Sequence, residues 1–227
     1  YFDSPIAYIF IGFFALLFGY FFVALLSAFT SQSMQMMLQG GGSMNVNQQL
    51  ITPLFLNASV IILFVLPSIT MRTYAEEKRS GTIELLLTSP LTDVELILGK
   101  FIGAMVLYAS LLTVTVIHVA TLFIFGQPEI WPVVTGYLGL LLMGGCFVSV
   151  GLLISSLTKN QIVAAMVTFA VFLMLWVIDW ISQFVGPTAQ QVLMYVSITQ
   201  HLDDFVRGVR DTKHLVYYAS FIGFGLF

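Results

Sequence analysis

The chain has 227 residues, of which 59% are hydrophobic, 15% aromatic and only 8% charged, and its mean hydropathy is +0.98. A soluble globular domain carries about 25% charged residues, so this composition excludes that class. The 8 Lys and Arg against 11 Asp and Glu give a net charge of −3, and they form no basic run of the kind that binds nucleic acid. The composition predicts an all-α membrane protein.

Six apolar segments predict transmembrane helices, because about 20 apolar residues cross a bilayer. They cover residues 5–29, 51–71, 97–125, 132–157, 162–184 and 214–227, the last cut short by the end of the sequence. Residues 30–49 are rich in Ser, Gln, Asn and Gly without a charge, which predicts a flexible loop. Between residues 186 and 213, the apolar stretch Val192 to Ile198 is too short to cross and predicts a re-entrant or interfacial helix before the sixth span. We expect residues 1–227 to form a single transmembrane domain.

The basic residues predict which loops face the cytoplasm. They gather after the second span, at Arg72, Lys78, Arg79 and Lys100, and after the fourth, at Lys159. The N-terminus is therefore predicted to be cytoplasmic in a multi-pass protein. The loop after the fifth span, with Arg207, Arg210 and Lys213, is a mild exception to this pattern.

The segment between the second and third spans carries the densest charge in the chain. Gly81 predicts a break in the helix leaving the second span, and residues 82–87 predict a short helix that Pro90 stops. Thr92 and Glu95 predict a capping box at the next helix, and Lys100 is expected to extend to the aqueous surface. A short helix connected to two spans can transmit a displacement caused by a soluble partner. An ordinary interfacial hairpin between two helices fits the composition equally well.

Small residues spaced four apart predict close helix contacts, at Gly99/Gly103, Gly145/Ser149 and Gly151/Ser155. His118, with Thr115 and Thr121 three residues to either side, forms a polar stripe that lines a path or makes interhelical hydrogen bonds. The histidines are scattered and lack partners at metal-ligand spacing, so no metal site is predicted. The sequence also offers no catalytic motif.

The charged segment resembles the hallmark of ABC-2 type transporter permeases. The resemblance rests on residues 76–90 (EEKRSGTIELLLTSP) and on residues 95–100 (ELILGK), which lead into the third span. Residues 1–8 (YFDSPIAY) and 205–211 (FVRGVRD) are similar to the gliding-motility-associated branch of that family. Together these similarities extend over essentially the whole chain.

The resemblance implies a six-span permease subunit that is not itself an enzyme, in a bacterial inner membrane. A coupling helix would dock into a cytoplasmic ABC ATPase dimer, which binds ATP and Mg²⁺; this chain has no cofactor of its own, since its Gly40–Gly42 run lacks a phosphate-binding lysine. The implied coupling residues are Glu76, Glu77, Lys78, Arg79, Gly81, Thr82, Glu84, Leu85 and Leu86. Further implied partners are a second permease copy or paralogue and an auxiliary membrane subunit with an extracytoplasmic domain.

The segment before the sixth span resembles helices that cap the exit of such exporters. A translocation path or outer gate would then involve His118, Thr115, Thr121, Tyr195, Asp203 and Arg207. The competing class is an ion-coupled secondary transporter or a membrane-embedded enzyme. Either would need ionisable residues within the spans, where the sequence offers little beyond His118 and Asp179.

Overall fold

The computed structural model describes residues 5–40, 45–82, 84, 92–126, 128–182, 184–208 and 211–227, and every regular element in these ranges is helical. Five helical segments are long and apolar enough to cross a bilayer. Their main helices are α1 (Pro5–Leu38), α2 (Thr52–Thr70), α5 (Asp93–Phe125), α6 (Ile130–Leu157) and α7 (Gln161–Ser182). The prediction of an all-helical fold with several membrane-length helices is confirmed.

The first five predicted spans each coincide with one of these helices. The predicted sixth, 214–227, falls on α10 (Thr212–Leu226), which has 15 residues and is shorter than a full crossing. Six complete spans therefore remain a proposal.

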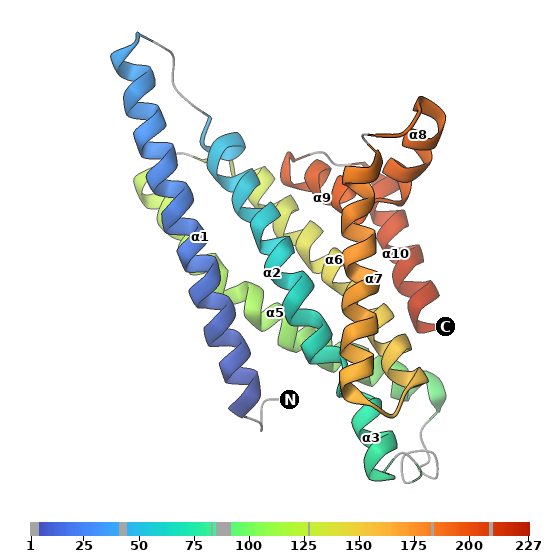
Figure 1. Ribbon diagram of the computed structural model, residues 1–227. Helices are drawn as coiled ribbons and strands as arrows, with labels where there is room; N and C mark the ends of the chain where they lie inside the picture. The colour runs from blue at the N-terminus through green and yellow to red at the C-terminus, as the bar shows by residue number, and fades with distance from the viewer. Residues whose placement is uncertain are drawn as a thin grey trace.

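The two ends of the helix bundle differ in what they carry (Figure 1). The start of α1, the α6–α7 connection and the short helix α3 (Ala75–Ser80) lie at one end. The end of α1 and the short helices α8 (Pro187–Val196) and α9 (Ile198–Val206) lie at the other. The start of α1 and the charged segment are thus on the same side of the bundle.

Residues 30–38 and 46–49 of the predicted flexible loop at 30–49 are helical. The first helix continues to Leu38, and a π-helical turn, η1 (Asn47–Ile51), precedes α2. Along this extension the hydroxyls of Thr30 and Ser31 donate to the carbonyls of Ser27 and Ala28, three residues earlier. These hydroxyls find hydrogen-bond acceptors in the backbone of their own helix, so the polar residues do not end the helix.

Helix α6 makes close contacts at its small residues. A Cβ added to Gly151 would lie 2.3 Å from the Thr70 Oγ1 of α2, and one added to Gly225 of α10 would lie 2.5 Å from the Ser149 Oγ of α6. These glycines let the helix backbones approach, as predicted. A Cβ on Gly99 of α5 would meet nothing within 4 Å, so this glycine makes no close contact within the subunit, and a contact with a second copy stays a prediction.

Two short helices replace the single one predicted around residues 192–198. The chain turns at Ser197, whose hydroxyl caps α9 by accepting a hydrogen bond from the Gln200 N–H at 3.3 Å. Leu202 and Phe205 are buried on α9, and a Cβ on Gly139 of α6 would lie 2.8 Å from the Phe205 Cβ. The serine cap divides the segment, and α9 packs across the end of α6 (Figure 1).

Candidate functional site

The charged end of the bundle is built around the junction of α2 and α3. Residues 71–74 form a turn, and α3 ends at Gly81, which has a φ of 75°. This left-handed conformation favours glycine, so the predicted break at Gly81 is confirmed. The helix leaving α2 is already interrupted by the 71–74 turn, which the sequence did not predict.

Ser155 of α6 fixes this turn. Its hydroxyl oxygen accepts hydrogen bonds from the Tyr74 and Ala75 N–H groups, both at 3.1 Å. The same hydroxyl donates to the Met71 carbonyl at 3.2 Å. Because Ser155 and Ala75 are completely buried, the serine satisfies helix-start donors that water cannot reach.

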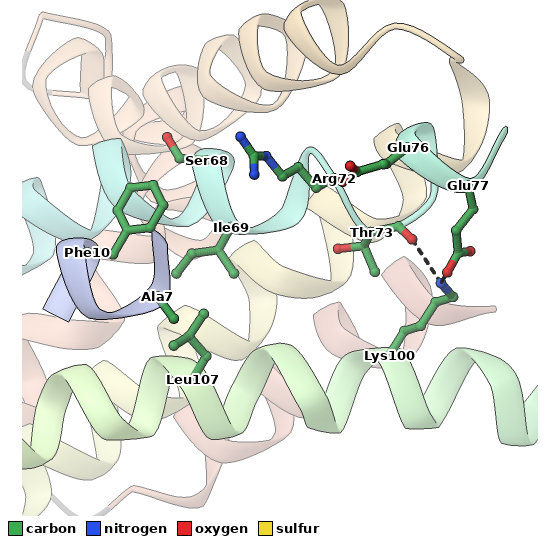
Figure 2. A pocket seen from close by; sticks show the side chains of 10 residues that line it. All are labelled: Ala7, Phe10, Ser68, Ile69, Arg72, Thr73, Glu76, Glu77, Lys100 and Leu107. Carbon is green, nitrogen blue, oxygen red and sulfur yellow. Dashed lines mark hydrogen bonds and ion pairs between the residues drawn. The ribbon is translucent and has the colours of Figure 1, made fainter. Parts of the chain in front are cut away.

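Lys100 ties α5 to the same junction (Figure 2). Its Nζ lies 2.5 Å from Glu77 Oε1, donates to the Thr73 carbonyl at 2.8 Å, and sits 4.5 Å from the centre of the Tyr74 ring. Only 15% of the Lys100 side chain is exposed, so the prediction that it extends to the aqueous surface is wrong. The carboxylate, the carbonyl and the ring together compensate its charge.

The side chains of α3 divide into two groups. Glu77 and Lys78 turn toward the bundle, where the Lys78 ammonium donates to the Ser156 carbonyl of α6. Glu76 and Arg79 are exposed, as are Thr82 and Glu84 beyond the helix. Leu85, Leu86 and most of the predicted helix at 82–87 lie outside the described residues.

The predicted capping box at the start of α5 is confirmed. The Glu95 N–H donates to Thr92 Oγ1 at 3.3 Å, and the Thr92 N–H donates to Glu95 Oε2 at 2.8 Å. Both ends of the segment between α3 and α5 are therefore fixed, one by Gly81 and one by this cap.

A cavity of about 460 Å³ opens beside the junction, between α1, α2 and α5. Figure 2 shows apolar side chains on one part of its wall and charged ones on the other. The lining residues are Ala7, Phe10, Ser68, Ile69, Arg72, Thr73, Glu76, Glu77, Lys100 and Leu107.

The side chains of the polar stripe predicted on α5 contact different neighbouring helices. The Thr115 hydroxyl lies 2.9 Å from the Tyr137 hydroxyl of α6, whereas the His118 ring packs edge-on against Phe18 and Phe22 of α1. Thr121 donates to the carbonyl of His118, and the His118 Nδ1 is buried with no hydrogen-bond partner among the described residues. A shared polar path remains a prediction, and this geometry does not assemble it.

The other predicted gate residues lie at the opposite end of the bundle from α3. Asp203 and Arg207 form an ion pair at 2.7 Å on α9, and Tyr195 is exposed on α8. Within the described residues, no hydrogen bond, ion pair or ring contact joins these three to His118, Thr115 or Thr121. The two sets are separate.

Sequence reasoning missed a contact between two histidines. His201 on α9 and His214 on α10 are both buried, and their Nδ1 atoms are 2.6 Å apart. The His201 Nε2 lies 3.0 Å from the Tyr195 carbonyl, and the His214 Nε2 lies 3.2 Å from Asp204 Oδ2. Because a carbonyl only accepts, His201 Nε2 must carry the proton, and its Nδ1 then accepts from His214. The two histidines are 13 positions apart in the sequence, and this spacing gave no sign of the contact.

Burial lowers the pKa of His201 below its usual value, since the charged ring loses hydration. The nearby His214 and Lys213 act in the same direction, whereas the hydrogen bond to the Tyr195 carbonyl and the Asp204 carboxylate oppose it. His201 is therefore neutral near pH 7.

The long apolar helices are those of a subunit embedded in a membrane, and the charged junction around α3 lies at one end of the bundle. A family model described as ABC-2 family transporter protein matches residues 27–200. The chain belongs to this family, as its charged segment suggested, and is a membrane permease subunit.

Particular relatives are found in Escherichia coli. The chain is 27% identical over 146 residues to the "Probable multidrug ABC transporter permease YbhR" of strain K12, and equally to the protein of that name in strain O157:H7. The match covers 62% of this chain and 38% of each relative, so the chain spans well under half of their length.

Proposed function

We propose that this permease subunit is driven by a separate cytoplasmic ATPase dimer acting on α3 and the segment that follows it. The observation that carries the proposal is the attachment of α3 to three long helices. It leaves α2 through the 71–74 turn, is tied to α5 by Lys100 and is tied to α6 by Ser155. A displacement of α3 is thereby passed to all three.

The residues of the segment would have different tasks. The exposed side chains beyond the cavity would contact the ATPase: Arg79, Thr82 and Glu84, with Leu85 and Leu86 after them, while Glu76 is exposed at the edge of the cavity. Glu77 and Lys78 would transmit the displacement through their bonds to Lys100 and Ser156. ATP and Mg²⁺ would be bound by the ATPase.

We also propose the assembly that the family resemblance implies. Residues 1–227 would form one transmembrane domain of six spans in a bacterial inner membrane, with a cytoplasmic N-terminus. A second permease copy or paralogue would complete the membrane part. An auxiliary subunit with an extracytoplasmic domain would join it if the chain belongs to the gliding-motility branch. The energy would serve export or the transmission of force, with a gate at Tyr195, Asp203 and Arg207.

Mutation of the segment tests the coupling. Gly81→Pro forces a negative φ where the backbone needs 75°, and Glu84→Arg reverses an exposed charge. In a purified complex with the ATPase, both variants should lose the ATPase stimulation that the wild-type permease gives. Lys159→Gln, an exposed change in the α6–α7 connection, is the matched control and should keep it.

Normal stimulation in both segment variants, with normal insertion and yield, would refute coupling through this segment. Flux in liposomes driven by a proton gradient, without any ATPase, would instead support the ion-coupled alternative.

A further inference from the structure

The cavity beside the junction has two kinds of wall, one apolar and one charged. Its apolar wall comes from Ala7 and Phe10 of α1, Ile69 of α2 and Leu107 of α5. The chain neighbours of these residues on α1 and α5, including Ile9 and Val106, are exposed on the apolar surface of long helices. Its charged wall comes from the ends of the helices. The cavity therefore joins an apolar wall to a charged one, and a lipid with its acyl chains and its head group requires this combination.

Two charged side chains in the cavity, Arg72 and Glu76, have no hydrogen bond or ion pair with another described residue. Lys100 and Glu77 neutralise each other in the ion pair at 2.5 Å. The Arg72 side chain extends toward Ser68, away from Glu76 (Figure 2).

This pattern specifies a ligand with one negative and one positive group. A guanidinium forms paired, charge-assisted hydrogen bonds with phosphate oxygens. The Ser68 hydroxyl on the same side donates to the Phe64 carbonyl of its own helix across a long 3.5 Å, and it can turn to donate to a phosphate instead. A carboxylate in turn accepts the N–H groups of a primary ammonium. The two requirements are met by a phosphate linked to an aminoethyl group, with an acyl chain for the apolar wall.

We propose that the cavity binds a phospholipid of the surrounding bilayer that has a phosphoethanolamine head group. Its phosphate lies on Arg72 and Ser68, its ammonium on Glu76, and one acyl chain runs along Phe10 and Leu107. The volume of about 460 Å³ is in the range of small-molecule sites and suits a head group with part of one chain. This inference goes beyond the proposed ATPase coupling, and its test needs no ATPase.

Native mass spectrometry of the purified full chain tests the site. The protein is delipidated and offered phosphatidylethanolamine, phosphatidylglycerol or phosphatidylcholine with identical acyl chains. The wild type should retain phosphatidylethanolamine preferentially. Arg72→Gln should lower its affinity about tenfold, as expected for the loss of a charge-assisted hydrogen bond, whereas Arg79→Gln, on an exposed arginine outside the cavity, should not.

Two further variants separate the head group from the chain. Glu76→Gln should abolish the preference for phosphatidylethanolamine over phosphatidylglycerol while retaining phosphate binding. Ala7→Phe fills the apolar part and should reduce binding of all three lipids with Arg72 intact. Each variant is compared with the wild type by size-exclusion elution, so that only folded protein is scored.

Equal retention of the three lipids by the wild type would overturn the proposal, as would equal losses in Arg72→Gln and Arg79→Gln. Failure of the wild type to retain any of these lipids would also overturn it. These results are independent of ATPase stimulation, so the proposed function and the lipid site can fail separately.

Discussion

Replacing Ser155 with alanine should loosen the attachment of α3 to the bundle. The substitution removes a hydroxyl that accepts from two backbone N–H groups, those of Tyr74 and Ala75, and donates to the Met71 carbonyl. Alanine fits the space but supplies no acceptor. The two N–H groups would then lie at the start of a helix without partners.

The magnitude follows from burial. An unsatisfied buried N–H costs about 1–3 kcal/mol. Ala75 is completely buried, so no water can replace the hydrogen bond that its N–H loses. Tyr74 is only partly buried, so water can compensate part of the hydrogen bond that its N–H loses. We therefore expect the Ser155→Ala variant to lose about 2–4 kcal/mol of unfolding free energy.

Reversible unfolding in mixed micelles measures this loss, and hydrogen–deuterium exchange locates it. The amides of Tyr74 and Ala75 should exchange faster in Ser155→Ala. The matched control is Ser156→Ala, since among the described residues the Ser156 hydroxyl bonds only the Leu153 carbonyl one turn back on its own helix. This control should change stability by less than about 0.5 kcal/mol. An equally stable Ser155→Ala variant with unchanged exchange at these amides would refute the reasoning.

Three other predictions concern stability. In a double-mutant cycle, Glu77→Gln and Lys100→Gln should show a coupling energy of about 1–2 kcal/mol in the unfolding free energy, because the pair is largely shielded from water. Gly144→Ala should cost about 1–3 kcal/mol in the same assay, since its Cβ would lie 2.1 Å from the Tyr108 ring. Burial lowers the folded-state pKa of His201, so the unfolded chain binds its proton first as the pH falls. Unfolding free energy should therefore decrease below about pH 6.5, by at most about 1.4 kcal/mol per pH unit from this group, and His201→Gln should flatten the profile.

Each of these has a result that contradicts it. Additive effects in the Glu77–Lys100 cycle would mean that the two charges act independently. For Gly144→Ala, the comparison is Gly12→Ala, whose Cβ would meet nothing within 4 Å; equal effects would exclude the Tyr108 clash as the cause. A pH profile of the wild type that His201→Gln leaves unchanged would assign the acid sensitivity to another group.

Local chemistry explains which parts of the fold were predictable. The five long apolar runs were found because crossing a bilayer requires about 20 apolar residues. The Gly81 break and the Thr92–Glu95 cap were found because each depends on residues within three positions of one another. Such features require no knowledge of which helices are neighbours.

The features that were missed depend on contacts between distant residues. Ser155 lies 81 positions from Tyr74, and Lys100 lies 23 positions from Glu77. His201 and His214 meet only because α9 and α10 pack together. The extension of α1 was missed for a different reason: its hydroxyls bond back to their own helix, which composition alone does not reveal.

The attachment of α3 also determines which helices would move together. Through Ser155 and Lys100 it fastens α2, α5 and α6 into one mechanical unit. The most apolar stretches of α1 and α7 are each only 17% buried, against 67% for those of α2 and α6. Both outer helices still pack against this unit, α1 on α2 and α5, and α7 on α2 and α6. A displacement of α3 would therefore move the fastened unit as one body, and it would reach α1 and α7 through side-chain packing rather than through the polar bonds that hold the unit together.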